Sequence, residues 1–184
     1  MQLSTPRKVK KNISGWLVPA GVPQTLKKGT QVEVMQALGD TITLATADGR
    51  LVRVDAEFAP CIGLKASDIN AMPLPEAPKN QSIESQVLDQ LRTCYDPEIP
   101  VNIVELGLIY KYEIKGTKKT GYTISVTMTL TAVGCGMGEV IAREIEAKIK
   151  RLPYVKSCKA TVTFDPPWDQ SRMSEAARLQ LGLL

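Results

Sequence analysis

One stretch constrains the fold of this chain more than any other, because it changes from one periodicity to another within thirty residues. Between residues 122 and 131 apolar and polar side chains alternate, and this period of two predicts a half-buried strand. After a glycine-rich turn the apolar residues recur at helical spacing, at Met137, Val140, Ile141, Ile145 and Ile149. The turn therefore lies at a strand-to-helix corner, and it carries Cys135.

Cys135 stands among three glycines, Gly134, Gly136 and Gly138. A thiolate is the reactive and metal-binding form of cysteine, and the beginning of a helix favours negative charge, so we predict a lowered pKa for this thiol. The glycines leave room for another backbone or a ligand to approach the sulfur. A free cysteine is more often a small buried hydrophobic residue. The glycines favour a functional thiol here, because a core position needs neighbours with side chains.

The remaining composition excludes several kinds of site. The four cysteines are far apart, so neither a CxxC metal motif nor a disulfide framework is present, and the chain has no histidine. Zinc sites of the Cys/His type and Ser–His or Cys–His catalytic pairs are therefore excluded within this chain. The sequence also lacks the phosphate-loop, dinucleotide-binding and HExxH motifs. It has no run long enough to span a membrane, and no apolar segment near Met1 resembles a secretory signal, so we expect a cytoplasmic protein.

The positive charge of the chain is concentrated at its start. The first 28 residues carry six basic side chains and no acidic one, whereas the formal net charge of the whole chain is +4. A basic N-terminal arm of this kind contacts nucleic acid or an acidic partner in some proteins, and in more of them it is a solvated tail. Aromatic residues are few and do not alternate with basic ones, so nucleic-acid binding is not expected.

The first third of the chain predicts a small all-β unit. Strand patterns lie near residues 32–34, 42–44 and 51–54, and turn residues at 39–40 and 48–49 separate them. Residues 66–80 contain three prolines and are the best candidate for a linker. We therefore predict a β domain with the basic arm at 1–65, a linker at 66–80, and a second domain at 81–184.

The second domain has the pattern helix, strand, strand, helix, strand, followed by a tail. Ser82 is placed to cap the first helix, and the two following strands form a hairpin. A strand–helix–strand unit crosses over right-handed and makes its strands parallel. We therefore predict an α+β fold, in which the all-β unit precedes an α/β sandwich with a three-stranded mixed sheet and helices on one face. The opposite face of the sheet is rich in threonine and would be covered by solvent, by the first domain or by a second copy of the chain. Trp168, in the tail, is predicted to be a packing anchor.

The best candidate constellation joins Cys135 to Asp96 and Glu98, because this topology brings the end of the first helix to the same sheet edge as the turn. A carboxylate beside a thiolate accepts a proton or helps to hold a metal. A turn in which Asp96 caps backbone N–H groups is an equally good interpretation. Cys94 is a weaker candidate for a second sulfur ligand. Since one or two cysteines cannot complete a four-ligand site, any iron or cluster would be labile and shared with a second subunit, a partner or small thiols.

Several motifs resemble the metal–sulfur cluster biosynthesis family, which contains the PaaD-like proteins. The similarity covers roughly residues 83–184 and rests on Asp96–Ile103, Glu105–Tyr110, Met128–Thr131, Gly134-Cys135 and Asp165–Trp168. Gly136 stands where many members have proline after the cysteine. The pattern Gly134–Gly138, together with the preceding β unit, looks like the SufT branch of the family.

The resemblance implies an auxiliary factor in iron–sulfur cluster assembly or transfer, not an enzyme. Cys135 matches the reactive cysteine of the family, Asp96 its acidic motif, and Thr131 a position before the cysteine. The implied partners are the iron–sulfur assembly machinery and client apoproteins, and a homodimer is a further candidate assembly. Two alternatives remain open at this point: a cysteine-dependent sulfur or thiol transferase that uses Asp96, and a nucleic-acid adaptor that uses the basic arm.

Overall fold

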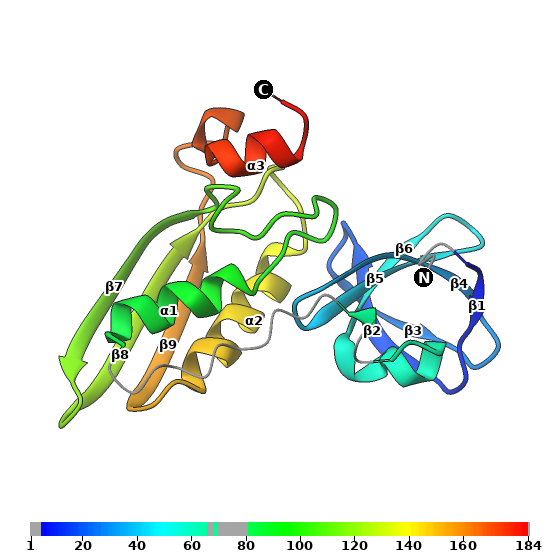
Figure 1. Cartoon of the computed structure of the whole chain (residues 1–184), viewed down its shortest axis with the longest axis horizontal. Helices are drawn as coiled ribbons and strands as arrows, with labels where there is room; N and C mark the ends of the chain where they lie inside the picture. The colour runs from blue at the N-terminus through cyan, green and yellow to red at the C-terminus, as the bar shows by residue number, and fades with distance from the viewer. Residues whose placement is uncertain (1–4, 66–67, 70–80, 184) are drawn as a thin grey trace.

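The computed structural model describes residues 5–65, 68–69 and 81–183, and it contains two sheets with separate hydrophobic clusters (Figure 1). The N-terminal sheet has six strands in the order β1-β4-β5-β6-β2-β3, and the C-terminal sheet has three in the order β7-β8-β9. The predicted α+β class is confirmed. The division at residues 65 and 81 stays a prediction, and the proposed linker lies outside the described residues except for Asp68 and Ile69.

The N-terminal sheet is antiparallel throughout, and its strands are β1 (Arg7–Lys8), β2 (Ile13–Val18), β3 (Val22–Leu26), β4 (Gln31–Leu38), β5 (Thr41–Thr46) and β6 (Leu51–Asp55). A short 3-10 helix, η1 (Ala56–Ile62), follows β6. Strands β4, β5 and β6 lie where the alternation predicted them. Along β4, for example, Val32 and Val34 are buried while Gln31 and Glu33 are exposed, as expected for a sheet with one covered face.

The prediction of a free basic arm was wrong for the described residues of that segment. Residues 7–26 contribute three strands, because buried Val9, Ile13 and Leu26 pack into the core of the sheet. The guanidinium of Arg7 donates a 3.1 Å hydrogen bond to the Gly63 carbonyl, which ties the start of the chain to the end of η1. The sparse apolar residues between the lysines are therefore core positions, and the lysines project outward.

The C-terminal part consists of α1 (Ile83–Arg92), β7 (Ile109–Thr117), β8 (Gly121–Met128), α2 (Gly138–Lys150), β9 (Val155–Val162), the 3-10 turn η3 (Gln170–Arg172) and α3 (Glu175–Gln180). The Ser82 side chain caps α1 by accepting the Ser85 N–H. Strand β8 pairs antiparallel with β7 and parallel with β9, as predicted. In the described part of the chain, no helix is long and apolar enough to cross a membrane.

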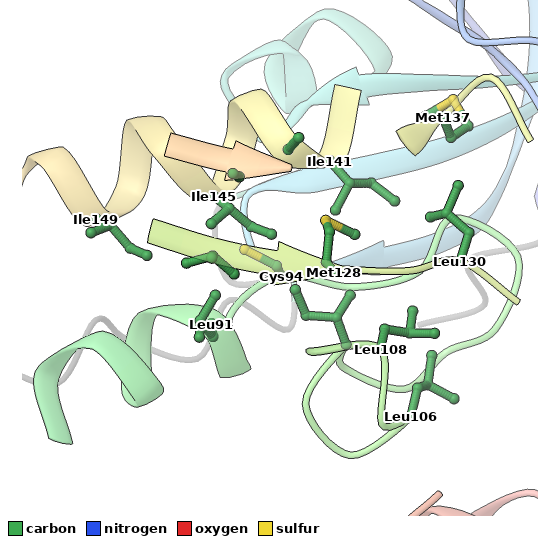
Figure 2. Packing of buried hydrophobic residues seen from close by; sticks show 14 of the residues in the cluster. Leu91, Cys94, Leu106, Leu108, Met128, Leu130, Met137, Ile141, Ile145 and Ile149 are labelled. Atoms are coloured by element: carbon green, nitrogen blue, oxygen red, sulfur yellow. The ribbon is translucent and has the colours of Figure 1, made fainter. Parts of the chain in front are cut away.

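Helices α1 and α2 cover one face of the C-terminal sheet, and the core lies between them and β8 (Figure 2). Leu91, Met128, Ile141 and Ile145 meet there, and all four are fully buried. The tail closes the far end of this core, where the Trp168 indole N–H donates a 2.8 Å hydrogen bond to the Leu106 carbonyl. The predicted anchoring role of Trp168 is confirmed.

One face of α2 packs against the N-terminal sheet through charged side chains. The Arg53 guanidinium, 2% exposed, lies 2.8 Å from the Glu144 carboxylate. Lys148 is 4% exposed; its ammonium lies 2.9 Å from Glu144 and donates to the Thr93 carbonyl. Val18 of β2 is buried in the C-terminal cluster. The N-terminal sheet is therefore joined to the C-terminal part by both apolar and ionic contacts.

Candidate functional site

The loop that carries Cys135 connects the end of β8 to the start of α2. Leu130 and Met137 are buried at its two ends and anchor it to the core, as Figure 2 shows. Between them Val133 and Gly134 are exposed and Cys135 is half-buried. The predicted strand-to-helix corner is therefore present, with the helix starting three residues after the cysteine. The Cys135 thiol donates a 3.6 Å hydrogen bond to the carbonyl of Pro19, in the turn between β2 and β3.

The prediction of a lowered thiol pKa was wrong in direction. Burial raises the pKa of Cys135, the Met137 N–H opposes this by hydrogen bonding to the sulfur, and the carboxylates of Asp96 and Glu98 raise the pKa further. The beginning of α2 thus contributes one favourable N–H group, which does not outweigh desolvation and two nearby negative charges. With its pKa raised in this way, the Cys135 side chain is mainly the protonated thiol.

The acidic turn after α1 lies beside this loop and has a structural role of its own. Asp96 is 4% exposed, and its Oδ1 atom accepts two 2.9 Å hydrogen bonds, from the N–H groups of Glu98 and Ile99. The turn-capping interpretation of Asp96 is therefore confirmed. Its influence on the Cys135 pKa shows that the structure also brings the carboxylate near the thiol. Glu98 is exposed at the same place.

Side chains of the N-terminal sheet donate hydrogen bonds to the main chain of this acidic turn. The Gln36 side-chain amide donates a 3.0 Å hydrogen bond to the Asp96 carbonyl, and the Thr43 hydroxyl donates a 3.3 Å hydrogen bond to the Pro97 carbonyl. Sequence reasoning missed both residues and also Pro19. No local pattern identifies them, since they contact main-chain atoms more than fifty residues away.

The other cysteines lie away from this arrangement. Cys94 is fully buried, its thiol points to the Gln90 carbonyl, and burial raises its pKa strongly. It is therefore not available to a metal that arrives from solvent, and we drop it as a candidate ligand. Cys158 is buried in the sheet, where desolvation raises its pKa to about 11, and Cys61 is buried in the N-terminal cluster. Thr131 is half-buried in the Cys135 loop, four positions before the cysteine.

The residues of the site do not form a complete metal-binding set. Within residues 5–65, 68–69 and 81–183, no group of three or more cysteine and acidic side chains is arranged to hold a metal ion. The donors that are not buried are the Cys135 thiol and the exposed Glu98 carboxylate, whereas the Asp96 carboxylate is buried and accepts two main-chain hydrogen bonds. A cluster normally requires four ligands. The donor set therefore fits a cargo that is also held from outside, and it does not fit a resident cluster.

A cleft of about 520 Å³ lies between the N-terminal sheet and helix α2, but Cys135 does not line it. Trp16, Arg53 and Glu144 are among its lining residues, and the Arg143 guanidinium stacks 5.4 Å from the centre of the Trp16 ring. Its walls carry as many basic as acidic side chains. The chemistry predicted from the sequence lies at the Cys135 loop and not in this cleft.

Residues 84–162, which include Asp96, Thr131 and Cys135, match the model of a protein family described as iron-sulfur cluster assembly protein. A relative from Porphyromonas gingivalis, named Fe-S protein maturation auxiliary factor, is 43% identical over 101 residues, which are 55% of this chain and 92% of the relative. This chain belongs to the iron–sulfur cluster assembly protein family. The Staphylococcus aureus maturation auxiliary factor SufT is 33% identical, over 48% of this chain and 96% of its own length.

A third family member, the Bacillus subtilis maturation auxiliary factor YitW, is 33% identical over 56% of this chain and 97% of its own. The predicted resemblance is thus confirmed for the C-terminal part. The family match begins at residue 84, so Pro19, Gln36 and Thr43 lie outside it. The contacts that these three residues make to the acidic turn and the Cys135 loop are therefore contributed by a part of the chain that the family pattern does not describe.

Proposed function

We propose that this protein is an auxiliary factor in iron–sulfur cluster assembly or transfer, and that Cys135 is the thiol that contacts the iron or the cluster. The observation that carries the proposal is the placement of Cys135. Among the cysteines of the chain it is the one that is not buried, and it lies in a loop at the end of a strand within the family match. The names of the related proteins, which are maturation auxiliary factors, agree with this role.

The cargo would be held jointly, because this chain offers one thiol that is not buried. Ligand exchange at iron is favoured when the donor chain contributes few ligands, since fewer bonds must break for the cargo to leave. The remaining ligands would come from an assembly protein, a client apoprotein, a second copy of this chain or small thiols. Glu98 is the second donor that we propose, and Asp96 positions it by capping the turn in which it lies. Thr131 belongs to the same loop as a lining residue.

A thiol or sulfur transferase is less well supported by the geometry. Such an enzyme needs a thiolate that forms readily, but burial and two carboxylates raise the pKa of Cys135. Asp96, the candidate base, already accepts two main-chain hydrogen bonds. A metal ion would remove this obstacle for a carrier, because coordination itself favours the deprotonated sulfur.

The test is the iron and acid-labile sulfide content after anaerobic purification together with a cluster-assembly scaffold protein. We expect iron and sulfide in the native chain and their loss in Cys135→Ser. Cys158→Ser is the matched control, because this cysteine is buried in the sheet and should leave the content unchanged. Equal iron and sulfide in the native chain and Cys135→Ser would contradict the assignment of the thiol.

A further inference from the structure

The turn between β2 and β3 lies directly over the Cys135 loop, and we infer that residues Pro19–Gly21 form a removable cover that controls what reaches the thiol. This cover belongs to the N-terminal sheet, so a segment outside the family match would regulate access to the family's cysteine. Its importance for cargo loading rests on the function proposed above. The existence of the cover does not depend on that function.

The contact is made by main-chain atoms on both sides. The Pro19 carbonyl accepts the Cys135 thiol at 3.6 Å, and the backbone of Gly21 meets the backbone of Gly136. A Cβ atom added to Gly21 would overlap the Gly136 carbonyl oxygen, and one added to Gly136 would overlap the Ala20 carbonyl oxygen. Two glycines that face each other are what permit this approach. Any larger residue at either position must push the turn and the loop apart.

This close packing explains why a glycine follows the cysteine. Gly136 has ordinary backbone angles, since it is not among the glycines with positive φ. Conformational freedom therefore does not require glycine there. The requirement is steric and comes from the turn of the other sheet, more than a hundred residues earlier in the chain.

The turn has a firm base and a weakly held tip, which is the property that a removable cover needs. At its base Val18 is buried in the C-terminal core, and the Gly21 N–H donates to the Leu17 carbonyl within the hairpin. Pro19 and Ala20 at the tip are exposed on their outer side. Besides the packing of the two glycines, the tip is linked to the loop by a sulfur hydrogen bond, and a thiol is a weak donor. Opening of the tip therefore costs little and leaves the hairpin in place.

An open tip would expose the sulfur toward solvent, whereas the closed tip limits access to small molecules. The cover would thus protect the thiol from bulky reactants in the absence of a partner. A partner that brings iron or a cluster would displace it. The proposal concerns access to the sulfur, and it predicts a difference between large and small reagents at the same cysteine.

The experiment measures alkylation of Cys135 by N-ethylmaleimide and by a maleimide that carries a long polyethylene glycol chain, in the full chain. Both reagents react through the same group, so the ratio of their rates reports access and is insensitive to the intrinsic reactivity of the thiol. Modified peptides are identified by mass spectrometry, which separates Cys135 from the three buried cysteines. The variant is Gly21→Ala. The matched control is Gly29→Ala, at a glycine that also has positive φ but whose added Cβ meets no atom within 4 Å.

We expect the bulky-to-small rate ratio to rise about fivefold or more in Gly21→Ala, the amount expected from losing one neutral hydrogen bond, and to stay unchanged in Gly29→Ala. An unchanged ratio in Gly21→Ala would overturn the cover. If Gly21→Ala does not fold, as judged by circular dichroism, the same rate ratio is measured in Val18→Ala, which loosens the base of the turn. The ratio should rise in this variant as well, and an unchanged ratio would overturn the cover. The iron measurement on Cys135→Ser is independent of this ratio, so either proposal can fail while the other stands.

Discussion

The buried ion pair between the N-terminal sheet and helix α2 allows a test of how strongly the two parts of the chain are coupled, with Arg53→Met as the perturbation. Arg53 is 2% exposed, and its guanidinium contacts Glu144 at 2.8 Å and the Thr41 hydroxyl at 3.1 Å. Removing one partner of a buried pair costs about 3–5 kcal/mol, because a charge is left without compensation. Glu144 keeps Lys148 at 2.9 Å, which places the expected loss at the lower end, about 3 kcal/mol. This loss corresponds to about a 150-fold change in the unfolding constant.

The chain contains a natural control and two natural probes for this experiment. Arg50 pairs with Asp48 at 2.7 Å, but both side chains are more than half exposed, so Arg50→Met should cost less than about 1 kcal/mol. Trp16 lies in β2 and packs against the C-terminal cluster and Arg143 of α2, whereas Trp168 lies in the C-terminal tail. Variants that retain one tryptophan therefore report on the contact between the two parts and on the C-terminal tail, respectively. Denaturant unfolding followed by fluorescence gives the transition seen by each tryptophan.

In the native chain we expect the two tryptophans to report one common transition, because apolar and ionic contacts join the sheets. In Arg53→Met we expect the transition of Trp16 to move to lower denaturant and to separate from that of Trp168. The reasoning is refuted if Arg53→Met loses no more stability than Arg50→Met, or if the two probes shift together. The same measurement tests the predicted domain boundary, since separate transitions would show two units that can unfold one at a time.

Two further predictions concern single carboxylates. Asp96→Asn keeps an oxygen that accepts the Glu98 N–H but removes a charge that raises the Cys135 pKa, so the pH–rate profile of Cys135 alkylation should shift to lower pH with the fold intact; an unshifted profile would mean that the charge is not felt at the sulfur. The hydrogen bond from the Ala160 N–H lowers the pKa of Glu146 in the folded protein. The ionised Glu146 carboxylate therefore stabilises the fold at any pH above its pKa in the unfolded chain, and this stabilisation is lost as the pH falls through its pKa in the folded protein. In Glu146→Gln the stability, measured by thermal unfolding between neutral and acidic pH, should therefore fall less steeply as the pH is lowered. The same pH dependence in Glu146→Gln and the native chain would contradict this role of Glu146.

Local patterns were sufficient for most of the C-terminal part. Alternation placed β8, helical spacing placed α2, and the Ser82 cap placed the start of α1, since each depends on neighbours within a few residues. The crossover rule then set the parallel pairing of β8 and β9. The same reasoning failed for β1–β3, because the apolar residues there are separated by lysines, prolines and glycines and only the assembled sheet shows which are buried.

Some features of the candidate site could likewise be predicted from local sequence, and others could not. The sequence predicted Cys135 as the candidate thiol, because glycine spacing and a change of periodicity are local, and it placed Asp96 in a turn. It predicted the wrong direction for the Cys135 pKa, since a helix terminus is visible in a sequence but burial and the approach of two carboxylates are not. The contacts of Glu144 and Lys148 are not visible in the sequence for a similar reason, because helical spacing shows which residues share a face but not what covers that face.

The amino-acid sequence by itself determined the order of the C-terminal elements, the strand-to-helix corner with its cysteine, and the family to which the chain belongs. Only the tertiary structure decided that the N-terminal sheet lies against that corner, that Pro19 accepts the thiol, and that Gly136 must lack a side chain. The physical reason is one of range. Propensity, capping and periodicity act between neighbours in the chain, whereas burial, steric overlap and charge depend on residues that meet only after folding.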